Sequence, residues 1–314
     1  MQCLGKVPHK EYVVSYPNHV NFTVDVPLDK NSSMYDDFSF IHMDLNPLIH
    51  FTGQFLPWHR SFVHRFERAL REECGFIGTQ PYWDWTKDAD DFYNSPIFDP
   101  DPRTGLGGWG DPSADFQITT GAFASDFVRR YPVPHPVRRN YTVISSIGGL
   151  GDGAPPITQP LNTFFTPERI NAMVDGFPGD FLGFQALFEG GDGSHGAIHQ
   201  IVGGDLVGMC PLAAGPNCKR GPKWTPNDPL FYLHHAMVDK LWYDWQRRHP
   251  ENFWSFHGGS IGAHSAPGIY AQFPNGGPPF LNFDTDVPGD GLLNNATIFE
   301  VMDTRAYDFC YTYE

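Results

Sequence analysis

Residues 227–246 read NDPLFYLHHAMVDKLWYDWQ, and this stretch decides the fold. Its apolar residues recur at helical intervals, which predicts a helix in the core: Phe231, Leu233, Met237, Leu241 and Trp242. His234 and His235 are set into this apolar stripe, and Asp239 lies one turn beyond His235 on the same face. A buried histidine with a carboxylate that orients it is typical of a metal ligand, and a hydrogen-bonded core histidine is the alternative.

A second histidine-bearing stretch, residues 189–205, reads EGGDGSHGAIHQIVGGD. His195 and His199 are four residues apart, so both imidazoles point to one side of a helix. That spacing suits two ligands to one metal ion.

A third stretch runs from residue 42 to residue 71 and offers His42, His50 and His59 beside a strongly amphipathic helix. Imidazole suits zinc, copper, iron and nickel, so the histidines alone do not name the metal. A zinc hydrolase would use one set of three histidines and would leave the other set unexplained.

Several motifs resemble the type-3 copper family of tyrosinases, catechol oxidases and molluscan hemocyanin domains. WHRSF followed by FERALR, and NDPLFYLHH followed by VDKLW, are similar to its two copper signatures. PYWDW at 81–85 and YTY at 311–313 also resemble the family. The resemblance spans nearly the whole chain and is greatest to short, secreted fungal polyphenol oxidases.

The resemblance implies two copper ions and six ligands: His42, His50 and His59 for copper A, and His195, His199 and His235 for copper B. It favours His235 within the histidine pair and leaves His234 a core or supporting role. In this family the copper pair binds O2 and takes two electrons from an o-diphenol, which leaves as an o-quinone.

Two further positions bear on the reaction by resemblance. Glu189 stands in an FEG context, where tyrosinase relatives use a glutamate to position a water that deprotonates phenols; a surface glutamate near a helix N-terminus is the alternative. The residue after the first copper B histidine, often asparagine in tyrosinases, is Gly196 here. Gln200 follows the second histidine and is expected to point elsewhere on the helix.

The function expected from these residues is that of a polyphenol oxidase that converts catechols to o-quinones, with weak or no hydroxylation of monophenols. One alternative is a tyrosinase in which Gly196 makes room for bulky monophenols such as methoxyphenols. Another is an O2 carrier of the hemocyanin type, which is disfavoured because such relatives are arrays of several units.

The two histidine sets must meet in one core, so we expect a single domain over residues 1–314 without a C-terminal lid domain, active without proteolysis. The predicted fold is mainly α, with a central four-helix bundle, long Gly/Pro-rich loops and a few short strands. The chain contains 33 glycines and 29 prolines, which supports the long loops.

The sequence also predicts individual elements. Helices are expected over 34–49 with an end near Pro47, over 56–74, near 120–131, from Thr166 onward, and over 180–203. Pro229 suits the first turn of the deciding helix, with Asn227 or Asp228 as its cap. Strands are expected near 12–14 and 22–26, and as a pair within 297–314.

The net charge of −15 argues against partners such as nucleic acid or anionic membranes, and the substrates expected are small phenols. No apolar run is long enough to cross a bilayer. Four N-glycosylation sequons begin at Asn21, Asn31, Asn140 and Asn295, and with the family they favour secretion. A monomer is expected.

The five cysteines leave at least one unpaired within this chain. CPLAAGPNC is a compact loop that predicts a Cys210–Cys218 disulfide, with two free thiols as the alternative; the pairing of Cys3, Cys74 and Cys310 stays open. Some relatives bond a cysteine sulfur to a copper-binding histidine. The position two before His50 is Leu48 here, so that local crosslink cannot form.

The other histidines, the PYWDW residues and one loop position are expected to have structural or gating roles. Surface or loop positions are expected for the other histidines: His9, His19, His135, His249, His257 and His264. Trp83, Asp84 and Trp85 are expected to pack beneath the bundle. Relatives have a gate residue thirteen positions before the last copper B ligand, which counts to Pro222 here.

Overall fold

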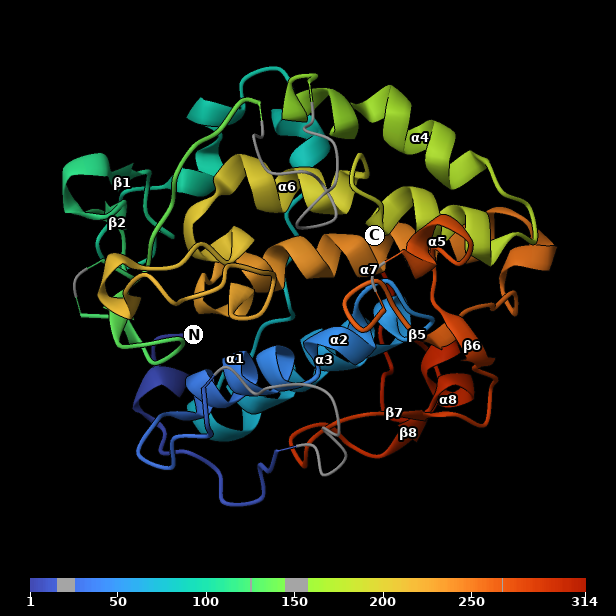
Figure 1. The fold of residues 1–314 in the computed structure, drawn as a ribbon, viewed down its shortest axis with the longest axis horizontal. Coiled ribbons are helices and arrows are strands. Elements are labelled where there is room, and N and C mark those ends of the chain that lie inside the picture. The colour runs from blue at the N-terminus through green and yellow to red at the C-terminus, as the bar shows by residue number, and fades with distance from the viewer. Residues whose placement is uncertain (16–25, 125, 145–157, 267) are drawn as a thin grey trace.

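The deciding stretch forms α7 (Leu230–Arg248), which lies across the middle of the molecule (Figure 1). The structure is a computed structural model that describes residues 1–15, 26–124, 126–144, 158–266 and 268–314. Helices α1 (Met34–Asp44) and α3 (Phe55–Cys74) lie on one side of α7 in this view, and α6 (Ser194–Val202) lies on the other. These four helices carry the three histidine-bearing stretches into one core.

Shorter elements surround the bundle. The other helices are α2 (Asn46–Ile49), α4 (Pro167–Asp175), α5 (Phe181–Glu189) and α8 (Ile298–Met302). The strands form antiparallel pairs: β1 (Gly110–Asp111) with β2 (Gln117–Ile118), β3 (Val128–Arg129) with β4 (His135–Pro136), β5 (Gly259–Ile261) with β6 (Gly277–Phe280), and β7 (Asp286–Val287) with β8 (Ala296–Thr297). The predicted fold class is therefore confirmed.

Local signals account for several helix boundaries. Ser33 and Asp36 form a reciprocal capping box at the start of α1, and the Thr166 side chain caps α4. Helix α3 ends at Gly75, whose φ of 64° is in the left-handed region that favours glycine. At the start of α7, Asp228 accepts the Leu230 N–H at 2.9 Å, as a capping residue does.

The predicted helix over 180–203 is wrong as a single element, because α5 and α6 are separated by a glycine-rich turn. A Cβ on Gly190 would lie 2.6 Å from the Ala186 carbonyl oxygen, and one on Gly193 would lie 2.3 Å from that of Phe188. Close backbone approach of this kind needs glycine. Gly203 ends α6 with a φ of 66°, as expected.

The helix predicted over 34–49 ends earlier than expected. It breaks at Leu45 rather than near Pro47, and Pro47 instead lies in the first turn of α2, where its missing N–H is not needed. His50 follows α2 in extended conformation.

The predictions for 120–131 and 297–314 are wrong. The described part of the first segment contains the short strand β3 and no helix, and Gly121 reverses the chain with a φ of 81° against the backbone of Gly107. The second segment begins with α8, capped by the reciprocal Thr297–Glu300 box, and has no strand pair. No strand forms at 12–14, and most of 22–26 lies outside the described residues.

Of the two disulfides, one closes a short loop and the other joins distant parts of the chain. Cys210–Cys218 is confirmed, and Cys3–Cys74 ties the N-terminal segment to the end of α3. Cys310 is unpaired and exposed in the part of the chain that the structure describes. In that same part, no helix combines the length and apolar character needed to span a membrane.

Asp239 plays a different part from the one its position in α7 suggested. Its carboxylate accepts Arg60 Nε at 2.5 Å, Tyr311 Oη at 2.5 Å and Tyr313 Oη at 2.7 Å, and it makes no contact with His235. Arg60 also lies over the Trp242 ring, 3.6 Å from its centroid. Asp239 therefore fastens α3 and the YTY motif to α7 and does not orient a histidine.

We expect Asp239→Ala to lower the free energy of unfolding by about 3–5 kcal/mol, because it leaves the buried Arg60 charge without its carboxylate partner. The matched control is Asp244→Ala, which removes the partly exposed Lys240–Asp244 pair and should cost well under about 1 kcal/mol. Urea unfolding followed by tryptophan fluorescence measures both, and equal losses would contradict this role.

Candidate metal centre

Two groups of buried histidines face one another in the bundle core. The first consists of His42 on α1, His50 after α2 and His59 on α3. The second consists of His195 and His199 on α6 and His234 and His235 on α7. Within each group the candidate ligand atoms lie within 4.8 Å of one another. All six predicted ligands are thus brought together, with His234 as an additional member.

Each histidine of the first group donates its Nδ1–H to a backbone carbonyl. The acceptors for His42, His50 and His59 are the carbonyls of Lys223 at 2.7 Å, Asn46 at 3.1 Å and Phe55 at 2.8 Å. This donation fixes the tautomer and leaves the Nε2 lone pair for a metal. Nε2 of His42 and of His59 is buried without a hydrogen-bond partner among the described residues. An unpaired buried acceptor of this kind fits an ion that the site is built to receive.

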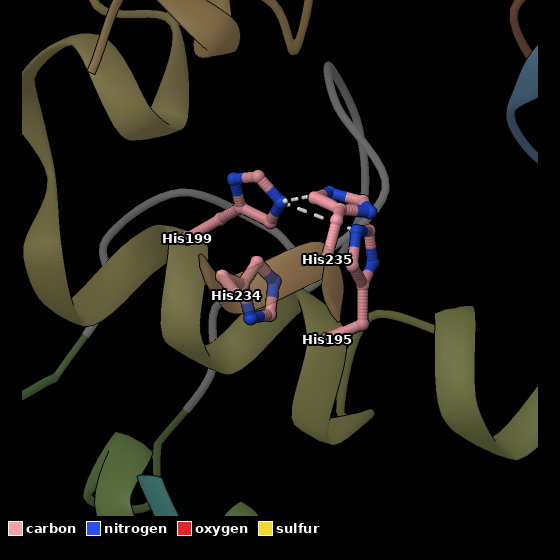
Figure 2. Close-up of side chains that lie close together, drawn as sticks. All are labelled: His195, His199, His234 and His235. Carbon is pink, nitrogen blue, oxygen red and sulfur yellow. Dashed lines mark hydrogen bonds between the residues drawn. The ribbon is translucent and has the colours of Figure 1, made fainter. Parts of the chain in front are cut away.

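In the second group, ring nitrogens converge from two helices (Figure 2). Nε2 of His199 lies 3.2 Å from Nε2 of His195 and 3.3 Å from Nε2 of His235. Imidazole nitrogens bound tetrahedrally to one ion at about 2.0 Å would lie about 3.3 Å apart. His199 also donates its Nδ1–H to the Leu206 carbonyl. The spacing therefore fits three ligands on one metal.

The two members of the α7 pair differ in what they face. The His235 ring stacks on His59 of the first group with centroids 4.3 Å apart. The His234 ring stacks on His195 at 5.4 Å and lies 6.3 Å from Trp85. His235 therefore points toward the first group, and His234 toward the aromatic layer beneath the bundle, where Trp83 and Trp85 are buried as expected.

Burial keeps these imidazoles neutral. It lowers the pKa of His42 to about 3 and that of His199 to about 4, and it lowers the pKa of His59 and His235 well below the usual value. A histidine must be neutral to bind a metal ion, so the dry core presents the ligands in the required form.

Glu189 lies at the C-terminal end of α5 and is 3% exposed. One carboxylate oxygen accepts the Phe51 N–H at 2.6 Å, and the other accepts the Gln185 amide at 3.0 Å. Burial raises the pKa of Glu189 well above its usual value. Phe51 has a φ of 54°, an unfavourable conformation for a large side chain. The alternative of a surface glutamate is wrong.

Gly196 on α6 has room for a small side chain. A Cβ there would lie 3.5 Å from the Gly190 carbonyl oxygen and 3.8 Å from Gln200 Nε2, which are ordinary contacts. The expectation that Gln200 points elsewhere on the helix is wrong, because its amide lies beside position 196. Oε1 of Gln200 is buried without a partner among the described residues.

Two other histidines, His9 and His135, are not surface residues as expected. His9 pairs with Asp37 at 2.5 Å and His135 with Asp205 at 2.9 Å, and all four side chains are buried. Their partners lie 28 and 70 residues away, so no local pattern could reveal them. His257 is exposed as expected, and His19 lies outside the described residues.

His264 comes close to the first group and was missed as a neighbour of the site. Its ring lies 6.3 Å from that of His50 and 5.3 Å from that of Phe51. Pro222, the expected gate position, offers its carbonyl to the Asn46 amide at 2.9 Å.

A helical bundle that brings two histidine groups together defines a candidate binuclear metal protein, and comparison with known proteins identifies its family. The model of the common central domain of tyrosinase matches residues 32–248. Tyrosinase-like protein phomQ1 of Diaporthe leptostromiformis is 33% identical over 297 residues, which are 91% of this chain and 69% of that protein. Oxidase hkm6 of Aspergillus hancockii is 32% identical over 312 residues, 88% of this chain and 99% of that one.

Among solved structures, a mutant of the polyphenol oxidase from Thermothelomyces thermophila matches with a TM-score of 0.69 and 25% identity, over 100% of this chain and 83% of that one. The chain therefore belongs to the tyrosinase family, and it is a copper oxidoreductase whose co-substrate is O2.

The lowered pKa values predict that the metal-free protein loses stability in acid. Unfolded histidines take up a proton near pH 6.5, so below that pH the unfolded state binds more protons than the folded state. The free energy of unfolding should fall by up to about 1.4 kcal/mol per pH unit for each such histidine. Urea unfolding of metal-free protein at pH 7.5, 6.5 and 5.5 measures this slope, and His42→Gln should reduce it; a stability that rises on acidification would contradict the assignment.

Proposed function

We propose that both histidine groups bind copper: His42, His50 and His59 hold copper A, and His195, His199 and His235 hold copper B. The free Nε2 atoms of the first group and the 3.2 and 3.3 Å spacings of the second support this assignment. When bound, the copper pair supplies the redox chemistry that moves electrons from a phenol to O2. The protein holds the rings neutral, fixes the tautomers of His42, His50, His59 and His199, and excludes water.

His235 rather than His234 is the third ligand of copper B in this proposal. Its ring stacks on His59 across the two groups, and its Nε2 lies close to that of His199. His234 packs instead between α6 and Trp85. Its ring packs against the His195 ring and holds that ring in position.

The reaction that we propose is the oxidation of o-diphenols to o-quinones, with weak hydroxylation of monophenols. A phenol has a pKa near 10, so a monophenol needs a held base or a held water to lose its proton at neutral pH. Each Glu189 oxygen accepts one N–H group and keeps a lone pair for a water, and a second polar side chain is needed to fix that water in place. The observation that carries this proposal is Gly196, which supplies no such side chain.

Gln200 accounts for residual activity toward monophenols. Its amide lies beside position 196, and its Oε1 is buried and unpaired within the described residues. The small size of Gly196 favours a second candidate function, the hydroxylation of bulky monophenols such as methoxyphenols.

We further infer that the protein acts outside the cell as a monomer on small phenols. Two disulfides support an oxidising compartment, and the sequon residues Asn31 and Asn295 are exposed. Release into the medium of a glycosylated protein on expression of the gene tests this placement.

We expect His59→Ala and His235→Ala each to lose about one of two bound coppers and nearly all activity, because three imidazoles per ion are needed to hold it. His64→Ala is the matched control, since His64 lies on the same helix but packs against Phe309 and Tyr311. Metal analysis by mass spectrometry gives the stoichiometry. Two full equivalents of copper in His235→Ala would reject that ligand, and loss of one in His234→Ala would transfer the role to His234.

We expect Gly196→Asn to raise the rate of tyramine hydroxylation at least several-fold while changing dopamine oxidation little. The added Cβ fits without a close contact, so the fold should tolerate it. Gly196→Ala is the control, because it fills the same space without a polar group. Initial rates on this matched pair of substrates decide the matter, and a wild type that uses both at equal rates would contradict the proposal.

A further inference from the structure

A single loop reaches one histidine of each metal group. We call residues 204–224 the strap. The carbonyl of Leu206 accepts the Nδ1–H of His199, and the carbonyl of Lys223 accepts that of His42 at 2.7 Å. Between these two contacts the chain leaves the core and returns to it. The strap therefore touches both metal groups through backbone oxygens alone.

The strap also reaches a third histidine indirectly. The Pro222 carbonyl accepts the Asn46 amide at 2.9 Å, and the Asn46 carbonyl accepts the Nδ1–H of His50 at 3.1 Å. His59, in contrast, donates to Phe55 on its own helix and does not depend on the strap. The orientation of three of the six proposed ligands thus follows the position of this loop.

The middle of the strap is closed into a ring. The Cys210–Cys218 disulfide joins its two sides, and the Gly221 N–H donates to the Gly208 carbonyl at 3.1 Å. A Cβ on Gly208 would lie 1.7 Å from the Gly221 carbonyl oxygen, so glycine is required for this approach. The two ends of the strap therefore move together.

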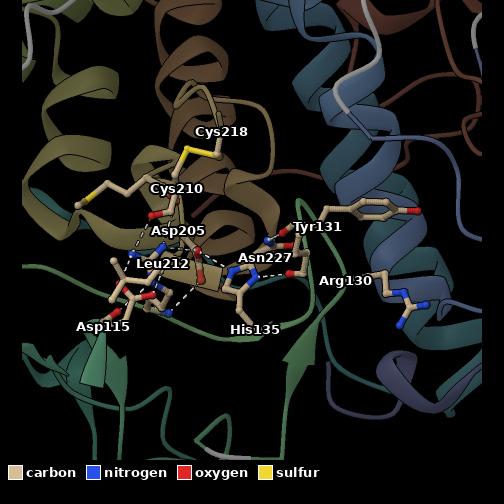
Figure 3. A network of polar contacts seen from close by, with 12 residues as sticks. Asp115, Arg130, Tyr131, His135, Asp205, Cys210, Leu212, Cys218 and Asn227 are labelled. Atoms are coloured by element: carbon tan, nitrogen blue, oxygen red, sulfur yellow. Dashed lines mark hydrogen bonds and ion pairs between the residues drawn. A yellow bond between two sulfur atoms is a disulfide. The ribbon is translucent and has the colours of Figure 1, made fainter. Parts of the chain in front are cut away.

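Buried charges anchor the ring to the body of the protein (Figure 3). The Arg138 guanidinium donates to the Met209 carbonyl at 3.0 Å, the Cys210 carbonyl at 3.3 Å and Asp115 Oδ1 at 3.0 Å. Asp205 precedes Leu206 and is fully buried. Its carboxylate accepts the backbone N–H of Arg138 at 2.9 Å and the Nε2–H of His135 at 2.9 Å. Charge-assisted bonds in a dry interior hold geometry firmly.

We propose that Arg138 and Asp205 are positioning residues for both copper sites: they hold the strap so that its carbonyls aim one ligand histidine of each metal group. The inference rests on the ligand set proposed above. Among the described residues, neither side chain makes a hydrogen bond or ion pair with a proposed copper ligand, so their effect must pass through the strap. The two coppers are therefore coupled, because displacement of one loop misaligns a ligand of each.

The main test is Arg138→Lys, which keeps the charge but loses the planar fork that spans Met209, Cys210 and Asp115. We expect both coppers to bind about tenfold to a hundredfold more weakly, as when partners of metal-binding histidines are lost. The matched control is Arg65→Lys, an arginine on α3 whose planar fork instead spans the Leu292 carbonyl and Glu72. Competition with a chelator measures the affinity for each copper.

A second readout does not involve metal at all. Imidazole N–H signals of metal-free protein, labelled with nitrogen-15 at histidine, report the Nδ1–H bonds directly. Arg138→Lys should weaken or broaden the signals of His42 and His199 and leave that of His59 unchanged. A merely structural loss of stability would affect all three signals alike.

Should Arg138→Lys fail to fold, the double variant Cys210→Ser/Cys218→Ser opens the ring at half-buried positions and should give the same pattern. Loss of one copper only, or no change in either variant, would overturn the proposal. A wild type that binds fewer than two coppers would instead overturn the proposed ligand set. The two failures are therefore distinguishable.

Discussion

The structure depends on burying uncharged imidazoles, four of which donate an N–H to a backbone carbonyl. A dry helical core is costly for such groups unless the N–H finds an acceptor. In the first group all three acceptors are backbone carbonyls, and His199 in the second uses another. The helices, the turn after α2 and the strap are placed so that a backbone carbonyl accepts the Nδ1–H of each of these four histidines. Metal binding, in this view, completes a hydrogen-bonding pattern that the backbone begins.

Much of this arrangement could be predicted from sequence, because it rests on periodicity. The i, i+4 spacing of His195 and His199 and the apolar stripe of residues 227–246 fix which rings share a helix face. Together with the family resemblance, they led to all six proposed ligands and to the bundle. The T-x-x-E capping box that begins at Thr297 is also visible in the sequence. The alternation of apolar and polar residues over 297–314 favoured a strand pair instead.

The rest could not be predicted, because the partners come from far along the chain or have no side chain. Asp239 is recruited by Arg60, Tyr311 and Tyr313, which lie 179, 72 and 74 residues away, so its position one turn from His235 was misleading. The carbonyls of Leu206 and Lys223 would be offered by any amino acid at those positions. The break between α5 and α6 depends on glycines whose close contacts exist only in the folded molecule.

Phe51 joins a metal-binding residue to the buried acid in the space of one peptide. It follows His50, holds a left-handed φ of 54°, and gives its N–H to Glu189. A conformation of this kind costs on the order of 1–2 kcal/mol in a large residue, so the fold gives up thermal tolerance to keep this geometry. Substitution of Phe51 by glycine or asparagine would therefore raise heat resistance, because these residues adopt a left-handed φ at lower cost. Both residues keep the backbone N–H that Glu189 accepts, so a more heat-resistant variant would retain its hold on the acid.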